Sequence, residues 1–128
     1  MIKILLVDDQ PLIRRGLSMR LALEPDLLVV AEANDGMQAL EVIPEIQPDV
    51  VIMDVEMPKM DGVTAAARLH ELFPEIPVII LSIHDTTSLK AHARAAGAVA
   101  FVEKQSGVNA LLQEIRNAAN KSTKEMDT

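Results

Sequence analysis

The chain contains no cysteine, no tryptophan and no tyrosine, and only two phenylalanines among its 128 residues. The absence of cysteine excludes a disulfide framework, a thiolate zinc site, an iron–sulfur cluster and a cysteine nucleophile. No apolar run approaches the roughly 20 residues that a membrane-spanning helix requires. The first apolar run, Ile2–Val7, meets acidic residues too soon for a signal peptide. We therefore expect a cytoplasmic protein with no membrane partner.

Basic residues are in the minority: 12 lysines and arginines stand against 19 aspartates and glutamates, which gives a formal net charge of −7. A nucleic-acid binder needs a basic face that releases counterions from phosphates. We therefore expect no DNA binding by this chain at physiological salt. The composition, 49% hydrophobic and 24% charged, is that of an ordinary globular chain, and the length fits one domain.

Five short apolar runs are rich in valine, isoleucine and leucine. They are Ile2–Val7, Leu27–Ala31, Val50–Met53, Val78–Leu81 and Val99–Val102. Most are continuous rather than alternating, which is typical of strands covered on both faces of a parallel sheet. The second run drifts into alternation, as an edge strand would. Segments with apolar residues three and four positions apart follow the runs and indicate helices. The pattern predicts an α/β fold: a (βα)5 doubly wound five-stranded parallel sheet with helices on both faces.

Capping residues, a glycine and a proline mark the expected ends of the helices. The predicted N-caps are Asp35, Asp61, Ser106 and either Thr86 or Thr87. Gly97 stands where a left-handed residue ends a helix, and Pro44 should kink the second helix or end it near Ile43. Residues 1–120 form the predicted domain. Residues 121–128 belong to a polar stretch without an apolar stripe, and they are predicted to be a solvated tail or the start of a linker.

Polar residues follow the predicted strands where each strand ends. They are Asp8 and Asp9 after the first strand, Asp54 after the third, Ser82 after the fourth, and Glu103 and Lys104 after the fifth. Ligands of open α/β sheets bind at this carboxyl edge. If the first and third strands are neighbours, three aspartates share one crevice. Two unit charges about 4 Å apart repel by about 4 kcal/mol at an effective dielectric near 20. Such a cluster must either raise a pKa or bind a cation, and its oxygen ligands suit Mg²⁺.

The same set of groups suits phosphoryl transfer. The metal neutralises developing charge, Lys104 can hold a phosphoryl oxygen, and a carboxylate can be the covalent acceptor. Any one of these residues alone is more often a cap or a solvated group. Their combination at the ends of four strands of one small domain is what indicates a site.

These motifs resemble the receiver domain of bacterial response regulators, the CheY-like phospho-acceptor module of two-component signalling. The resemblance covers Ile2 to Ala119. It is carried by the segments Leu6-Val7-Asp8-Asp9, Asp49 to Gly62 (DVVIMDVEMPKMDG), Leu81-Ser82, Gly97-Ala98 and Phe101-Val102-Glu103-Lys104. It implies a strand order of 2-1-3-4-5, in which the first and third strands are neighbours.

The resemblance also implies a role for each matching residue. Asp54 would be phosphorylated. Mg²⁺ would be held at Asp8, Asp9 and Asp54, with the main-chain carbonyl of Glu56 as a further ligand. Lys104 would contact the phosphoryl group, Ser82 would be the switch hydroxyl, and Phe101 the switch aromatic. Pro58 and Gly62 would shape the loop after the acceptor. Gln105 replaces the proline that often follows the lysine, and Phe101 stands where tyrosine is common.

The implied function is to accept a phosphoryl group from a sensor histidine kinase and to change conformation. The only chemistry expected of the chain itself is its own phosphorylation and dephosphorylation. The third to fifth helices and the tail look like receivers that precede a LuxR-type DNA-binding domain, so transcription would be controlled through a domain absent from this chain. Homodimerisation on phosphorylation is a further expectation.

Other interpretations stay open. A stand-alone receiver would act through protein–protein contacts, and a degenerate receiver would only dock. A Mg²⁺-dependent phosphohydrolase of the haloacid-dehalogenase class also uses an aspartate at a strand end, but its second aspartate two residues on corresponds to Gln10 here. A flavodoxin-like FMN carrier needs a phosphate loop and flanking aromatics, and this chain has neither tyrosine nor tryptophan.

Overall fold

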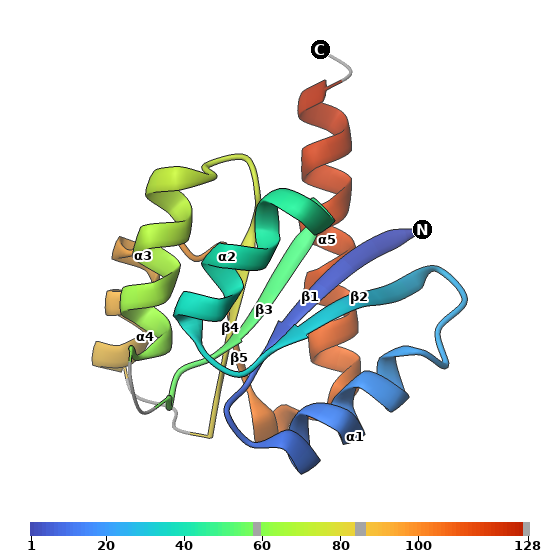
Figure 1. Cartoon of the computed structure of the whole chain (residues 1–128), viewed down its shortest axis with the longest axis horizontal. Coiled ribbons are helices and arrows are strands. Elements are labelled where there is room, and N and C mark those ends of the chain that lie inside the picture. The colour runs from blue at the N-terminus through green and yellow to red at the C-terminus, as the bar shows by residue number, and fades with distance from the viewer. Residues whose placement is uncertain (58–59, 84–86, 127–128) are drawn as a thin grey trace.

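The computed structural model describes residues 1–57, 60–83 and 87–126, and side chains up to residue 120. Within this part of the chain, five parallel strands form one sheet in the order β2-β1-β3-β4-β5 (Figure 1). The strands are β1 (Ile2–Val7), β2 (Leu27–Ala33), β3 (Val50–Asp54), β4 (Val78–Ser82) and β5 (Ala100–Glu103). The predicted fold class and strand order are therefore confirmed.

Helices cover both faces of the sheet, as predicted (Figure 1). They are α1 (Pro11–Leu21), α2 (Gly36–Ile46), α3 (Gly62–Leu72), α4 (Thr87–Ala95) and α5 (Val108–Met126), with a 3₁₀ turn at Lys104–Ser106. Helices α2, α3 and α4 pack on one face, whereas α1 and α5 pack on the other. Among the described residues, no helix has the length and apolar character needed to cross a membrane.

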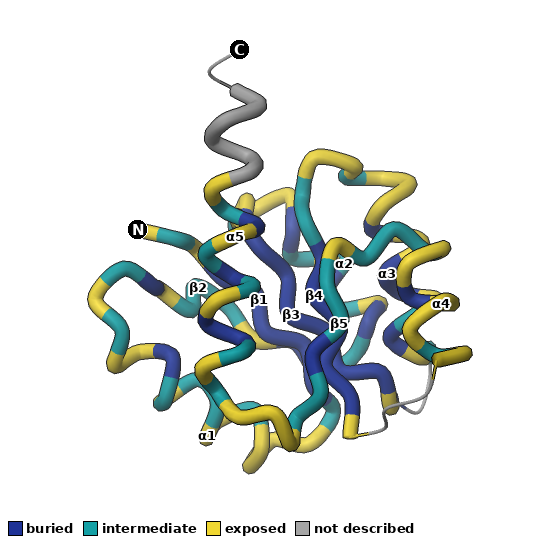
Figure 2. Tube along the Cα trace, turned by 180° about the vertical axis from the view of Figure 1, so that it is seen from behind, coloured by how far each residue is buried: buried dark blue, intermediate teal, exposed yellow. Residues whose placement is uncertain are grey.

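The core consists of two apolar layers separated by the sheet. Successive strand residues point to opposite faces, so Leu5 and Val7 enter the layer under α2–α4, while Ile4 and Leu6 enter the layer under α1 and α5. Every residue of β3 and β4 is buried, and the buried segments run through the middle of the molecule (Figure 2). Burial on both faces explains why these strands read as continuous apolar runs.

Strand β2 lies at one edge of the sheet, where the sequence places it. It continues in alternation to Ala33, past the predicted end at Ala31, and its pairing with β1 shifts register between Ile4 and Leu5. The extra length matters for the site because the main-chain N–H of Asp8 donates to the carbonyl oxygen of Ala33 at 3.1 Å.

Pro44 lies inside α2, so of the two predicted outcomes, a kink or an end near Ile43, the end near Ile43 is wrong. The helix reaches Ile46 and ends at Gln47, which has a left-handed conformation with φ of 45°. Proline lacks the N–H that would bond to the preceding turn, but this position is close to the end of the helix. The N–H of Gln47 restores a helical bond by donating to the carbonyl oxygen of Ile43 at 2.9 Å.

Two of the predicted N-caps are confirmed. Asp35 accepts a hydrogen bond from the N–H of Gln38 at 2.8 Å, and Asp61 accepts one from Thr64 at 2.9 Å. Ser106 is not the cap of α5, because it lies in the 3₁₀ turn and Gly107 stands directly before the helix.

The predicted ends of α4 fall partly outside the described residues. Thr86 is among the residues not described, and Thr87 is the first residue of the helix. Gly97 has the predicted left-handed conformation, with φ of 102°. Its N–H donates to Arg94, and the N–H of Ala98 donates to Ala93, each at 3.0 Å. This pair of bonds is a Schellman motif, which turns the chain into β5.

Helix α5 continues to Met126 and so includes most of the segment predicted to be a polar tail at 121–128. Lysine, glutamate and methionine have high helix propensity, and a formed helix extends more readily than it nucleates. An apolar stripe is therefore not required for these last turns. The interpretation of this segment as the start of a linker remains a prediction.

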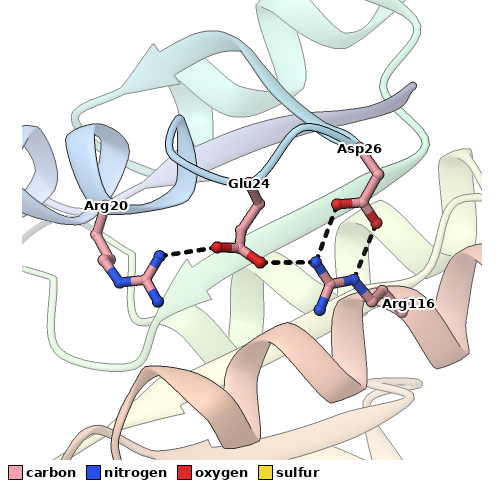
Figure 3. Close-up of polar contacts among 4 residues, drawn as sticks. All are labelled: Arg20, Glu24, Asp26 and Arg116. Carbon is pink, nitrogen blue, oxygen red and sulfur yellow. Dashed lines mark hydrogen bonds and ion pairs between the residues drawn. The ribbon is translucent and has the colours of Figure 1, made fainter.

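The middle of α5 is tied to the turn between α1 and β2 by a chain of ion pairs (Figure 3). The guanidinium of Arg116 bonds to both carboxylate oxygens of Asp26 and to Glu24, at 2.9 Å each. Glu24 also accepts from Arg20 of α1 at 3.1 Å. These contacts join α5 to the end of α1 and the turn after it, about 90 residues earlier in the sequence.

Candidate functional site

Three aspartates meet at the carboxyl edge of the sheet, as the sequence predicts. Asp54 ends β3, and Asp8 and Asp9 follow the neighbouring strand β1. One carboxylate oxygen from each lies within 4.8 Å of the others. Asp8 is 3% exposed and Asp54 is 6% exposed, whereas Asp9 is half-buried. The sheet order is therefore what turns three separate strand ends into one acidic cluster.

The backbone and Arg14 hold Asp8 in place. Its carboxylate accepts a hydrogen bond from the N–H of Gln10 at 2.9 Å, which orients the side chain from its own turn. Its carbonyl oxygen accepts from Arg14 at 2.6 Å. Arg14 also bonds to Glu32 at 2.9 Å and Asn34 at 2.8 Å, so α1 fastens the end of β1 to the end of β2. The sequence contains no signal for this role of Arg14.

Lys104 supplies the cation of the cluster. It directly follows β5, and its Nζ lies 3.0 Å from Oδ1 of Asp54 and 3.7 Å from Oδ2 of Asp8. An ion pair between buried groups compensates for lost hydration only when its geometry is good. One ammonium facing three carboxylates leaves the cluster net negative, so the site still favours a further cation.

Burial raises the pKa of the Asp54 carboxyl above its ordinary value of 3.8, and the negative charges of Asp8 and Asp9 act in the same direction. The hydrogen bond and charge of Lys104 oppose this shift without cancelling it. Ionisation of this buried carboxyl is therefore unfavourable when no cation other than Lys104 is nearby. A bound cation would stabilise the ionised form.

The end of β3 at Asp54 is also fixed by the start of α3. The N–H of Gly62 donates to the carbonyl oxygen of Val55 at 2.9 Å. A Cβ atom at position 62 would overlap the carbonyl oxygen of Asp54 and would lie 2.8 Å from Cα of Val55. Only glycine therefore allows the helix to begin against the main chain of Asp54 and Val55. Pro58, predicted to shape the same loop, lies outside the described residues.

A cleft of about 600 Å³ opens beside the cluster. It is lined by Asp9, Gln10, Ile13, Asp54, Glu56, Met57, Ile83 and Lys104. Glu56 is exposed and lines the rim of this cleft. The role of its main-chain carbonyl as a metal ligand stays a prediction. Ile13 and Ile83 are apolar rim residues that the sequence does not single out, because nothing in their local pattern differs from a helix face or a strand end.

Ser82 and Phe101 lie on the sheet face that α2–α4 cover. Ser82 is fully buried at the end of β4 and pairs with Glu103 of β5, while Ile80 pairs with Phe101. Because alternate strand residues share a face, Ser82 and Phe101 project to the same side. Phe101 does not line the acidic cleft. It lines a separate cleft beside α4.

The donor chemistry of the cluster fits Mg²⁺. All its ligands would be carboxylate or carbonyl oxygens, and this ion prefers a small number of protein oxygens with water completing the octahedron. The described residues Asp8, Asp9 and Asp54 provide three such carboxylates in one place. A neighbouring lysine, a covalent acceptor and a hard cation are the components of a phosphoryl-transfer site.

This combination of doubly wound fold and acidic edge site defines a receiver domain. Residues 4–116 match the family model described as the response regulator receiver domain, and the chain belongs to that family. Members of this family bind Mg²⁺ at an acidic pocket and serve in two-component signalling.

Two curated relatives illustrate the match. The transcriptional regulatory protein DegU of Brevibacillus brevis is 38% identical over 118 residues, covering 92% of this chain and 50% of DegU. A protein-glutamate methylesterase/protein-glutamine glutaminase of Carboxydothermus hydrogenoformans is 42% identical over 116 residues, covering 89% of this chain and 34% of that protein. The chain therefore spans half or less of the length of these relatives, and they share a receiver while differing in activity.

The fold agrees with solved structures of the family. A two-component response regulator of the LuxR family from Aurantimonas superimposes with a TM-score of 0.89 and 31% sequence identity. The match covers 93% of this chain and 85% of that one.

Proposed function

We propose that this receiver accepts a phosphoryl group on Asp54 from a phosphohistidine of a sensor histidine kinase in the cytoplasm. The carrying observation is the 3.0 Å contact between Lys104 and Asp54 within a buried cluster of three carboxylates. Asp54 contacts a cation and lines a cleft. This arrangement supports a chemical role for its carboxylate rather than the capping of a helix.

In the transfer, a carboxylate oxygen of Asp54 forms a bond to phosphorus as the bond between phosphorus and the histidine nitrogen breaks. The electron pair of the broken bond leaves with the imidazole, and the product is an acyl phosphate. Lys104 is placed to neutralise a phosphoryl oxygen. Mg²⁺, held by Asp8, Asp9, Asp54 and the main-chain carbonyl of Glu56, would supply further charge neutralisation. Hydrolysis of the acyl phosphate would reset the domain.

The phosphoryl group would then act as a switch. It adds a dianionic group with strong acceptor oxygens to a crevice that already holds three carboxylates. The hydroxyl of Ser82 would move toward it, and Phe101 would turn into the space that this movement opens. Pro58 and Gly62 would keep the acceptor loop in shape. A partner that prefers the switched state would shift the population further.

The output would be control of transcription through a DNA-binding domain outside this chain. The likeness to DegU and to a LuxR-family regulator supports this choice. The methylesterase relative shows that receivers of similar sequence also accompany an enzyme, and a stand-alone receiver remains the second candidate. Homodimerisation on phosphorylation belongs to the proposal.

The acceptor is tested with acetyl phosphate and Mg²⁺ followed by mass spectrometry of the intact chain. We expect the gain of one phosphoryl group, absent in Asp54→Asn and retained in Asp49→Asn. The latter is a matched control, because Asp49 lies at the opposite edge of the sheet and bonds to the N–H of Lys3. Phosphorylation that persists in Asp54→Asn would refute the assignment. Repeated turnover of a phosphomonoester would favour the phosphohydrolase instead.

A further inference from the structure

Strand β5 directs the side chains of Phe101 and Glu103 to the same face of the sheet. Phe101 and Glu103 are two residues apart, and residues at this spacing project to one side of a strand. That side is the one covered by α4. Phe101 is half-buried at the margin of the core layer under α2–α4, and Glu103 pairs with Ser82 of β4.

Lys90 of α4 reaches both of these side chains. Its Nζ lies 5.9 Å from the centroid of the Phe101 ring and 3.7 Å from Oε1 of Glu103. A cation within about 6 Å of a ring is attracted by the ring quadrupole. The ion pair is exposed, with 46% of the Lys90 side chain and 28% of the Glu103 side chain accessible. Such a pair adds little stability by itself, but it keeps the ammonium near the ring.

The ring has two different surroundings on this face. Toward α4 it lines a cleft of about 180 Å³, formed by Lys90, Ala93, Arg94, Ala98, Val99, Ala100 and Phe101. Toward Asp54 lies Ser82, which is fully buried. The proposed turn of the ring in that direction therefore requires the segment of Ser82 to move. The cation therefore contacts the ring in the first arrangement, and this contact is lost if the ring turns toward Ser82.

We propose that Lys90 is a positioning residue for Phe101: held by Glu103, it favours the ring position beside α4 and so opposes the switched state. This inference rests on the proposed function, because it assumes that phosphorylation of Asp54 turns the ring. Phenylalanine has no phenol hydroxyl that could hold the ring in place, and Lys90 supplies a cation over the ring instead. A cation that stabilises only the resting position of the ring lowers the population of the switched position. It therefore weakens the binding of any group, such as beryllofluoride, that favours the switched position.

The ring can be observed directly because the chain has only two phenylalanines. Protein labelled with 4-fluorophenylalanine gives one fluorine signal for Phe73 and one for Phe101, assigned with Phe73→Leu. Beryllofluoride with Mg²⁺ mimics the phosphoryl group and moves the Phe101 signal from its resting to its switched position. In Lys90→Met without beryllofluoride, the signal should lie part of the way along that line. Lys90→Arg, which keeps the cation, should leave it at the resting position.

The second readout is the apparent affinity for beryllofluoride. We expect a gain of roughly two- to five-fold in Lys90→Met, from the usual strength of an exposed cation–π contact. Lys3→Met is the matched control, because it removes the same charge from an exposed site at the far end of β1. In a Phe101→Leu background, Lys90→Met should produce no gain, since the ring on which the lysine acts is missing.

The outcomes separate this inference from the proposed function. Failure of beryllofluoride to bind to the parent protein would refute the proposed function. Binding without movement of the Phe101 signal would refute the ring switch and the role of Lys90 with it. If the signal moves but Lys90→Met binds beryllofluoride as the parent does, or gains equally in the Phe101→Leu background, Lys90 has no positioning role and the proposed function stands.

Discussion

Two glycines of this receiver stand in opposite surroundings. Gly62 begins α3 against the main chain of Asp54 and Val55, so that a side chain there would displace β3 or the helix. Gly16 lies inside α1, and a Cβ atom there would have no other atom within 4 Å. Glycine in a helix interior is unfavourable relative to alanine. The first glycine is therefore required by packing, whereas nothing within the described chain requires the second.

Substitution by alanine should separate these two cases. Gly62→Ala should lower the free energy of unfolding by about 1–3 kcal/mol, as overpacked sites do, and should slow phosphorylation because the acceptor moves. Gly16→Ala should raise the free energy of unfolding by about 0.4–1 kcal/mol. Urea denaturation of the parent and the two variants measures both changes in the free energy of unfolding, and the rate of phosphorylation by acetyl phosphate measures the effect on Asp54. A Gly62→Ala variant as stable as the parent would contradict the packing described here.

At the scale of single residues, the sequence predicts which residues gather in the acidic cluster, but it does not predict which side chains contact one another. Asp8, Asp9, Asp54 and Lys104 follow strands in the sequence, and the order of the strands brings them together. The bond from Arg14 to the carbonyl of Asp8 and the approach of Lys90 to Phe101 depend on side-chain directions across separate elements. No local pattern encodes such directions.

Helix α5 is joined to the rest of the molecule by the ion pairs of Arg116 (Figure 3). Hydrogen bonds from this guanidinium lower the pKa of Glu24 below its ordinary value of 4.5 and that of Asp26 below 3.8. A carboxyl whose pKa is lowered on folding stabilises the folded state above its ordinary pKa. This stabilisation is lost as the pH falls through the lowered pKa.

Removal of the guanidinium should therefore have a pH-dependent effect. Arg116→Gln should be less stable than the parent at about pH 7, and the difference should shrink once both carboxyls are protonated below their lowered pKa values. The effect should be small and should weaken with salt, because the pairs are exposed. Arg15→Gln on α1 is the control. An Arg116→Gln deficit that is unchanged in strong acid would show that packing, rather than charge, holds α5.

Element boundaries followed the sequence where one rule applied and departed from it where two rules competed. Strands β1, β3, β4 and β5 match their predicted bounds to within one residue, because continuous burial leaves a continuous apolar run, whereas β2 runs past its predicted end to Ala33. Pro44 removes one hydrogen bond, yet the apolar face of α2 keeps the helix packed to Ile46. The end of α5 was not predictable from an apolar stripe, because the sequence past residue 120 has none, although lysine, glutamate and methionine there have high helix propensity.

The whole molecule has a negative net charge, and its candidate site holds three aspartates and one lysine. A cation that binds only the folded state stabilises it by mass action, by about 2.7 kcal/mol at one hundred times its dissociation constant. Mg²⁺ should therefore raise the free energy of unfolding of the parent protein. The gain should shrink in Asp54→Asn and persist in Asp49→Asn, as measured by thermal or urea denaturation. Equal stabilisation of all three would place the ion elsewhere.

The most direct test of the central claim is a crystal structure grown with Mg²⁺ and beryllofluoride. The account predicts a beryllofluoride group bonded to the carboxylate of Asp54 and in contact with Nζ of Lys104. It also predicts Mg²⁺ beside this group, held at Asp8, Asp9 and Asp54 and at the main-chain carbonyl of Glu56. A structure in which the ion and the group are absent from Asp54, or occupy another part of the molecule, would contradict it.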